Sequence, residues 1–172
     1  MTIDELLKDK TKKQKDKTQT ISKWLLDGSL PVDELIAFAE GCKDADKATC
    51  IEAMEYATKL QTTLANDNVW AFVTNTLLEN APRLKWESAK VIGNIAHLFP
   101  AKLNKTINNL LLNARDNSTV VRWASAYALG EILKLKSKHN KNLFPAIEVL
   151  CNNEDNNGVK KKYVDAIKKV KK

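Results

Sequence analysis

The sequence is poor in residues that break helices. Its 172 residues include only 5 Gly and 4 Pro, and it shows no extended alternation of β-branched and polar residues of the kind found in half-buried strands. Hydrophobic residues make up 44% of the chain, which is enough to form the core of an ordinary globular protein. These features favour an all-α fold over any fold that contains a sheet.

Long apolar runs and targeting signals are also lacking. No stretch approaches the roughly 20 consecutive apolar residues that a membrane-spanning helix needs. The N-terminal stretch MTIDELLKDKTKKQKDK has no apolar segment after its charges and is rich in Lys and Asp rather than Arg. It therefore resembles neither a secretory signal nor an organellar presequence. We expect a cytoplasmic protein without a membrane partner.

Cysteine, histidine and catalytic motifs are scarce. Cys42, Cys50 and Cys151 are odd in number and have no C-x2-C spacing, which is typical of buried, reduced thiols. His97 and His139 stand in no motif with a nucleophile. The sequence also lacks H-E-x-x-H, G-x-x-x-x-G-K and G-x-G-x-x-G, the usual marks of zinc, nucleotide and dinucleotide chemistry. We therefore expect no metal, no cofactor and no enzymatic activity.

The net charge of +7 is concentrated at the two ends of the chain. Residues 1–17 hold six Lys and four acids, and residues 160–172 hold seven Lys and one acid, so the ends contribute +2 and +6. The body, residues 18–159, has 15 basic and 16 acidic side chains and is close to neutral. Lysine-rich ends predict solubility and weak, salt-sensitive attraction to polyanions rather than specific recognition of nucleic acid.

An internal repeat organises the chain. A set of mainly apolar or small residues with the spacing of one helix face recurs at offsets of 37 or 38 residues, with a Tyr at one position and a weaker first position in the earliest set. The sets are Leu84, Ser88, Val91, Ile92 and Ile95; then Val121, Ser125, Ala128, Leu129 and Ile132; then Val159, Tyr163, Ala166, Ile167 and Val170; and, before these, Asp46, Cys50, Ala53, Met54 and Ala57. The repeat predicts four similar helices, at about 46–60, 84–98, 121–135 and 159–171.

Other helices are expected between these four. They begin near Pro31, Asp67, Asn104 and Asn142, and polar residues such as Asp67 and Asn142 are suitable helix caps. An N-terminal helix around 20–27 would cover the first pair, as the exposed end of a repeat array requires. Residues 1–17 are expected to be either helical or frayed. The organisation predicted is a Lys-rich segment with a capping helix, residues 1–30, and one continuous repeat domain, residues 31–172.

The stretch DNSTVVRWASAYALGEIL resembles the turn and second helix of a HEAT repeat. It has Asp116, Arg122 six residues later, and small residues before Leu129 and Gly130. The resemblance implies a short right-handed α-solenoid of about four HEAT-like helical pairs, related to armadillo proteins. It also implies that Asp116 and Arg122 belong to a hydrogen-bonded ladder between repeats. The first unit departs from the pattern because Gly41 stands six residues before Lys47, so its place in a ladder is open.

The same resemblance places one set of residues on the concave side of the solenoid, off the buried stripe. Trp86 and Trp123 occupy equivalent positions in consecutive repeats. Aromatic rings beside polar groups suit recognition of a peptide or protein segment. The predicted contact residues are Tyr56, Trp86, Lys90, Asn94, Trp123, Tyr127 and Glu131. The alternative is that both Trp side chains pack on neighbouring helices and complete the core between repeats.

These observations predict a non-catalytic protein-interaction scaffold. One alternative is a HEAT-like nucleic-acid-binding protein. KWESAKVIGNIAHLFP is also faintly similar to a Trp-containing helix of alkylation-repair DNA glycosylases, whose cleft Trp86, Trp123, Tyr127 and Glu131 could imitate. The near-neutral body and a total of three Arg disfavour a groove that holds duplex DNA.

Overall fold

The chain is all-helical in the computed structural model, which describes residues 1–171. The α-helices, in chain order, are α1 (Ile3–Lys8), α2 (Gln14–Asp27), α3 (Val32–Glu40), α4 (Asp44–Leu60), α5 (Asp67–Thr76), α6 (Pro82–Ile95), α7 (Leu103–Asn113), α8 (Thr119–Lys134), α9 (Asn140–Asn153) and α10 (Asn157–Lys171). Short 3-10 turns lie at Thr62–Leu64, Ala96–Leu98 and Pro100–Lys102. No strand occurs within residues 1–171.

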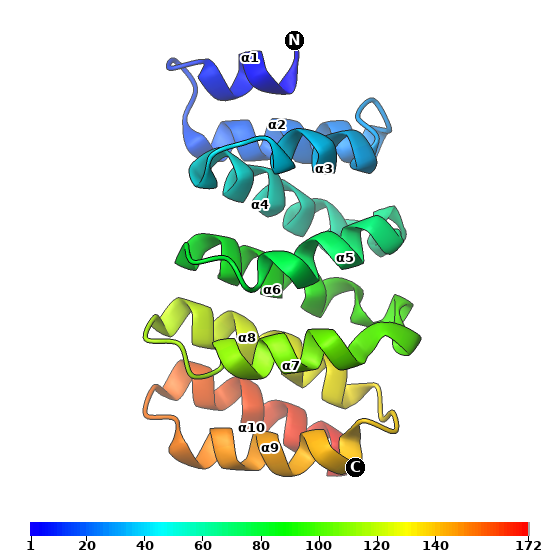
Figure 1. The fold of residues 1–172 in the computed structure, drawn as a ribbon, viewed down its shortest axis with the longest axis vertical. Coiled ribbons are helices and arrows are strands. Elements are labelled where there is room, and N and C mark those ends of the chain that lie inside the picture. Colours follow the sequence, from blue (N-terminus) through cyan, green and yellow to red (C-terminus); the bar gives the residue numbers. More distant parts are fainter. Residues whose placement is uncertain (172) are drawn as a thin grey trace.

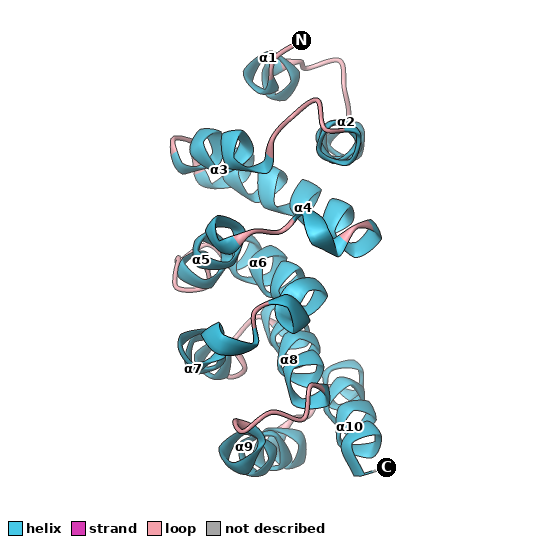
Figure 2. Cartoon of the chain, turned by 90° about the vertical axis from the view of Figure 1, so that its right-hand side faces the viewer, coloured by secondary structure: helices cyan, strands magenta, loops and turns pink. Residues whose placement is uncertain are grey.

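The helices form two layers, and successive pairs stack along one axis (Figure 1). One layer contains α2, α4, α6, α8 and α10, each packed on the next. The other layer contains α3, α5, α7 and α9. The free side of the first layer is concave, because α4 and α10 reach further out than α6 and α8 between them (Figure 2). This arrangement is an all-α solenoid of four full pairs preceded by α1 and α2.

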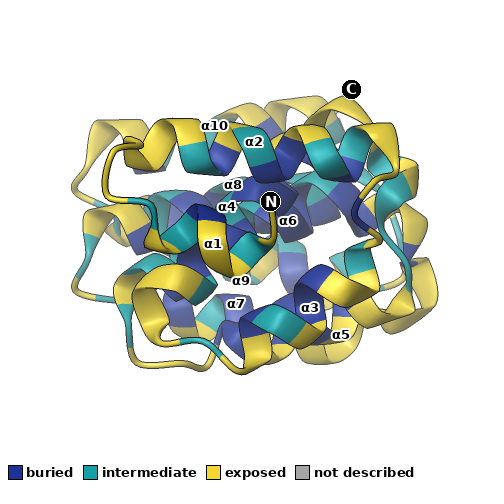
Figure 3. Cartoon of the chain, turned by 90° about the horizontal axis from the view of Figure 1, so that it is seen from above, coloured by how far each residue is buried: buried dark blue, intermediate teal, exposed yellow. Residues whose placement is uncertain are grey.

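The predicted apolar stripe forms the core between the layers. Leu84, Ile92 and Ile95 of α6 are fully buried, as are Val121 and Leu129 of α8. Viewed along the stack, buried positions lie between the layers and exposed positions lie on the outer surfaces (Figure 3). The four repeated helices begin up to two residues earlier than the stripe indicates, because the first turn of each contains mainly polar or exposed residues.

Local signals explain several helix ends, although two predicted caps are wrong. The side chain of Asn66, not Asp67, accepts the hydrogen bond from Val69 N at the start of α5. Asn142 lies inside α9, which begins at Asn140. Helix α8 begins after Ser118, whose hydroxyl accepts a hydrogen bond from Val121 N. A shift of one or two residues is common at helix ends, which fray.

The N-terminal segment is part of the folded stack. Thr2 and Glu5 form a capping box that starts α1, and Leu6 is fully buried within the core. The ammonium group of Lys17 in α2 donates a hydrogen bond to Leu7 O. Helix α2 begins at Gln14, six residues earlier than the helix expected around 20–27. Of the two conformations expected for residues 1–17, helical or frayed, the helical one is found over Ile3–Lys8 and from Gln14 onward.

No helix within residues 1–171 combines the length and the apolar character required to cross a membrane.

Candidate binding site on the concave face

The predicted contact residues lie on α4, α6 and α8, which are consecutive helices of the concave layer. Trp86 and Trp123 are both partly buried and pack against the core, but neither is fully enclosed. Tyr56 is the most open aromatic residue of the set, with 42% of its surface exposed. Each Trp side chain therefore packs on the core between repeats and also keeps a part that is open to solvent.

Trp123 belongs to a stack of rings topped by a lysine. Its ring centroid lies 6.2 Å from that of Tyr127, and the two planes are inclined by 18°. Lys162 from α10 places its Nζ atom 4.8 Å from the Trp123 ring centroid and 5.7 Å from that of Tyr127. A cation over an aromatic face is attracted by the ring quadrupole. At the α8–α10 end of the concave face, the cation over the aromatic rings is therefore Lys162 of the protein itself.

Tyr127 and Asn94 connect three helices by hydrogen bonds. Tyr127 Oη donates to Asn94 Oδ1 at 2.7 Å. Asn94 Nδ2 donates in turn to Glu55 O at 3.1 Å and to Thr58 Oγ1 at 3.2 Å. Burial, with smaller effects of Glu131 and Glu55, raises the pKa of Tyr127 to about 12, so the hydroxyl stays protonated at neutral pH. Asn94 and Tyr127 therefore hold α4, α6 and α8 together.

Two buried carboxylates lie where α4 meets α6. Glu55 is 6% exposed and Glu87 is 4% exposed. Lys90 Nζ lies 3.9 Å from Glu55 Oε2 and 3.8 Å from Glu87 Oε1. Trp86 Nε1 donates a 2.8 Å hydrogen bond to Glu87 Oε1. Burial raises the pKa of Glu87, and the nearby Lys90 ammonium and the Trp86 hydrogen bond only partly oppose this effect.

A tighter ion pair lies next to these carboxylates. Arg83 Nη2 contacts Glu52 Oε2 at 2.6 Å. The same carboxylate oxygen accepts a hydrogen bond from Thr18 Oγ1 of α2 at 3.3 Å. Glu52 and Arg83 thus satisfy each other and join α2, α4 and α6 on the concave side.

Glu131 lies towards the far end of α8, where its carboxylate contacts Lys134 Nζ at 2.8 Å. Glu131, Asn94, Tyr127 and His97 line a shallow pocket of about 290 Å³ together with residues of α4. His97 is exposed at its rim. The ion pair of Glu131 is open to water, since about a third of each side chain is exposed.

The inter-repeat ladder lies at the opposite end of the repeated helices, near the turns. Lys47 contacts Glu79 at 3.3 Å, Lys85 contacts Asp116 at 3.0 Å, and Arg122 contacts Glu154 at 3.0 Å. In each pair a cation of one repeat reaches the carboxylate of the next. Lys47 takes part although its own repeat has Gly41 in place of an acid.

Asp116 and Arg122 do not pair through the Asp116 carboxylate. Arg122 Nη1 donates instead to the backbone oxygens of Asp116 and Asn117, at 3.0 and 3.2 Å. Burial tends to raise the pKa of Asp116, but the Ser118 backbone N–H, Lys85 and Arg122 outweigh it and lower the pKa. The Asp116 carboxylate is therefore ionised and serves the preceding repeat.

The structure offers no clear site for metal chemistry within residues 1–171, where no three His, Cys, Asp or Glu side chains are grouped to hold an ion. The three cysteines are free. Cys50 is buried, and this burial raises its thiol pKa to about 12, so the group is not a thiolate at neutral pH.

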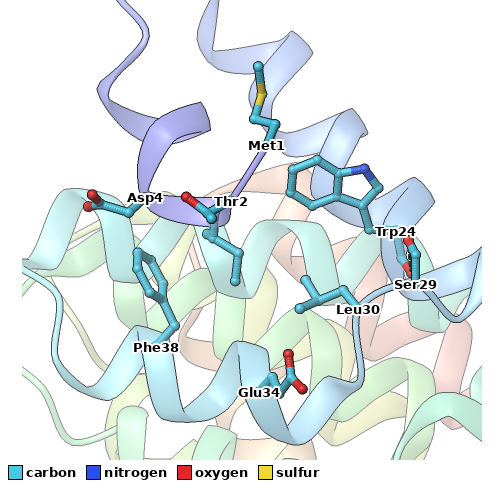
Figure 4. Close-up of a pocket in the computed structure, with 9 residues that line it drawn as sticks. Met1, Thr2, Asp4, Trp24, Ser29, Leu30, Glu34 and Phe38 are labelled. Carbon is cyan, nitrogen blue, oxygen red and sulfur yellow. Dashed lines mark hydrogen bonds between the residues drawn. The ribbon is translucent and has the colours of Figure 1, made fainter.

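A groove of about 820 Å³ lies at the N-terminal end of the stack, away from the predicted contact residues. Met1, Trp24, Leu30 and Phe38 line it, with Asp4 and Glu34 at its edges (Figure 4). Trp24 comes from α2 and Phe38 from α3, so the groove is formed by α1 lying across the first helices.

Glu55, Glu87 and Lys162 are among the residues of this face that the sequence prediction missed. The repeat alignment contains a signal for them. The column of Glu87 reads Thr49, Glu87, Ala124 and Lys162, and the column of Glu55 reads Glu55, Gly93, Gly130 and Lys168. A carboxylate in a column where other repeats carry small residues indicates a buried charge. The prediction considered only the columns of Trp86, Lys90 and Asn94, which lie two, six and ten residues after Leu84.

The stack of helical pairs and its concave layer define a solenoid of the armadillo and HEAT type. No protein-family model and no curated protein matches the sequence significantly. Among solved structures, the designed armadillo repeat protein YIII(Dq)4CqI is similar with a TM-score of 0.68 and 15% identity, over 98% of this chain and 80% of that chain.

Two further structures have the same architecture. The karyopherin Kap121p, in a structure with the SUMO protease Ulp1p, gives a TM-score of 0.54 at 13% identity, over 91% of this chain and 21% of the karyopherin. The designed armadillo repeat protein YIII(Dq.V1)4CPAF, in complex with the peptide (KR)4, gives 0.51 at 13% identity, over 98% and 97% of the two chains. At these identities the similarity establishes the armadillo/HEAT-like fold alone.

Proposed function

We propose that the protein is a non-catalytic scaffold that binds a peptide or a protein segment along its concave face. The observation that carries the proposal is that Tyr56 and Trp86 lie on adjacent helices of this face and are partly open to solvent. Aromatic side chains that are already held in place bury much area at little entropic cost when a partner docks. The same role is supported by the similar solenoids, one with a bound peptide and one with a bound protease.

The predicted contact residues have different parts in this proposal. Tyr56, Trp86, Lys90, Trp123 and Glu131 would meet the partner directly, since each keeps an exposed part. Asn94 and Tyr127 would act mainly by holding three helices in register through their hydrogen bonds. A binding scaffold of this kind needs no catalytic side chain. An enzymatic role such as that of a DNA glycosylase gains no support from Tyr127 and Glu131, because the Tyr127 hydroxyl is hydrogen-bonded to Asn94 and the Glu131 carboxylate is paired with Lys134.

Selection from a random peptide display library on the immobilised full chain tests the proposal. Selected peptides should bind the wild type saturably and lose roughly tenfold or more affinity for the double variant Tyr56→Ala/Trp86→Ala, as truncation of aromatic anchors usually causes. The matched control is Leu78→Ala/Leu112→Ala, which removes two exposed apolar side chains outside the predicted contact set. Peptides that bind both variants equally well would show that the concave face is not the recognition surface.

The salt dependence of binding distinguishes the scaffold proposal from specific nucleic-acid binding. Weak binding of polyanions through the Lys-rich ends should disappear between low and physiological salt in a gel-shift titration. Tight, sequence-dependent binding of DNA or RNA at physiological salt would replace the scaffold proposal with the nucleic-acid alternative.

A further inference from the structure

The outer side of α10 has apolar residues that no further helix within residues 1–171 covers. Helix α10 packs on α8 and α9, yet its Val164 and Ile167 remain partly exposed. The residues in the same two columns of the repeat are fully buried in α6 and α8, each of which has a following helix packed on it: Ala89 and Ile92, then Ala126 and Leu129. Val164 and Ile167 therefore form one half of a helix–helix interface.

Two lysines, Lys160 and Lys168, belong to the same side of α10. Lys160 occupies the column of the ladder cations, and the other members of this column each contact a carboxylate of the following repeat: Lys47, Lys85 and Arg122. Lys160 contacts no carboxylate within residues 1–171. Lys168 occupies the column of Gly130, where a Cβ atom would come within 3.1 Å of Ala166 in the next helix. Both columns therefore face a following repeat.

The groove at the opposite end of the stack has matching properties. Trp24, Leu30 and Phe38 form its apolar walls (Figure 4), and its volume of about 820 Å³ accommodates several aliphatic side chains. Glu34 lines the groove and contacts no Lys or Arg within residues 1–171. The other carboxylate of the groove, Asp4, is paired with Lys8 at 2.7 Å. The groove thus combines an apolar floor with an unpaired negative charge.

The helices that carry these two surfaces have opposite net charges. Helix α10 contains six Lys and one Asp, so its net charge is +5. Helix α3, which contributes Glu34 and Phe38 to the groove, contains three acids and neither Lys nor Arg, so its net charge is −3. The two helices lie at opposite ends of the stack (Figure 1). One molecule therefore cannot bring them together, whereas two molecules placed end to end can.

From these surfaces we propose that the protein associates head to tail with a second copy of itself, the outer side of α10 docking on the N-terminal groove of the next molecule. Val164 and Ile167 enter the groove, and Lys160 and Lys168 lie beside Glu34. The interface is heterologous, since two different surfaces meet, so association continues beyond a dimer. The net charge of +7 on each copy opposes association in general, so the opposite charges of the two surfaces must favour this contact.

Sedimentation velocity of the untagged chain at increasing concentration tests the proposal. The wild type should form a series of species that grows past the dimer as concentration rises. Glu34→Lys should weaken association roughly tenfold or more, because it places a positive charge opposite the lysines of α10. Lys160→Glu/Lys168→Glu should weaken it to a similar extent from the other surface, because it places negative charges opposite Glu34.

A mixture of the two variants provides the sharper test. Each variant alone repels its own copies, but an equimolar mixture should associate again. Every contact between the two different variants pairs opposite charges, because either both surfaces are unaltered or both are reversed. Loss of folding cannot produce this recovery, and melting temperatures of both variants confirm that each is folded.

The matched controls are Glu40→Lys and Lys169→Glu, which reverse charges on the same two helices away from the proposed contact. Glu40 lines a separate pocket beside α5, and Lys169 is exposed in the concave-face column of Asn94. Both should associate within about twofold of the wild type, since an exposed charge outside the interface contributes little.

Four results would overturn the inference. The first is a wild type that is still monomeric at about 1 mM, where even weak complexes form. The second is association that stops at a dimer. The third is a mixture of the two variants that stays monomeric. The fourth is a loss of association in the controls as large as that in Glu34→Lys, or no loss in Glu34→Lys at all.

Discussion

The ring of Tyr127 lies against the backbone of Gly93: a Cβ atom at residue 93 would come within 2.2 Å of Tyr127 Cε2. The Tyr127 hydroxyl is fixed by its 2.7 Å hydrogen bond to Asn94, so the ring cannot swing aside without breaking that bond. Residue 93 lies inside α6, where Ala is ordinarily the better helix former. The absence of a side chain at this position therefore lets α8 approach α6 closely.

Gly93→Ala should consequently destabilise the wild type by about 1–3 kcal/mol through overpacking. In a Tyr127→Ala background the same substitution should stabilise the protein by up to about 1 kcal/mol, because only the helix propensity remains. Urea unfolding of the double-mutant cycle measures both changes. The same sign in both backgrounds would show that the two residues are not coupled in this way.

Glu87→Gln should raise stability at neutral pH, because it removes a carboxylate whose ionised form is disfavoured by burial. The pKa of Glu87 is raised from its ordinary value of 4.5, so the folded state holds this proton more tightly than the unfolded state. Ionised Glu87 thus reduces stability progressively as pH rises from 4.5 through its folded pKa. The gain in the variant should therefore shrink as pH falls towards 4.5. Urea unfolding of variant and wild type across this range measures the difference, and a gain independent of pH would contradict the assignment.

Arg122→Met should cost about 3 kcal/mol, since it leaves Glu154, whose side chain is 7% exposed, without its ion partner. It also removes two hydrogen bonds to backbone oxygens. Lys47→Met is the matched change at another ion pair of the ladder. It should cost less than about 1 kcal/mol, because its partner Glu79 is 47% exposed and remains hydrated. Chemical denaturation of the two variants gives the comparison, and equal costs would argue against burial as the cause.

Leu6→Ala should cost about 2–4 kcal/mol, although it lies in a six-residue helix near the chain's start. Leu6 is fully buried, whereas Leu60, at the end of α4, is 76% exposed. Leu60→Ala should change the free energy of unfolding by less than about 0.5 kcal/mol. Melting curves of both variants decide whether α1 belongs to the cooperative unit. A negligible effect of Leu6→Ala would mean that α1 frays independently.

The solenoid was predictable from the sequence because its main determinant is local. The spacing of Leu84, Ile92 and Ile95 specifies which face of one helix is buried, and its recurrence specifies a helix of the same kind in each repeat. The position of α1 was left open, because a short helix is stabilised only by its tertiary contacts, here those of Leu6.

The details of the concave face were less accessible because they depend on pairs of residues in different repeats. Asn94 and Tyr127 were predicted to lie on one face, of α6 and α8 respectively, but the sequence does not reveal their mutual hydrogen bond, which requires the close approach at Gly93. The six-residue spacing of Asp116 and Arg122 likewise does not reveal that each side chain reaches a different neighbouring repeat. Burial of Glu87 depends on the residues packed around it rather than on its own chemistry.

The hydrogen bonds from Tyr127 through Asn94 to α4 lie on the inner side of a curved stack, while the ion pairs of the ladder join the repeats near the turns. In such a stack each repeat meets only its immediate neighbours, so bending is shared among small rotations at successive interfaces. The solenoid should therefore flex elastically, with a small rotation at each interface between repeats. A ligand that bridges α4 and α6 would stiffen one of these interfaces, and the resulting change in curvature would alter the relative orientation of the two ends.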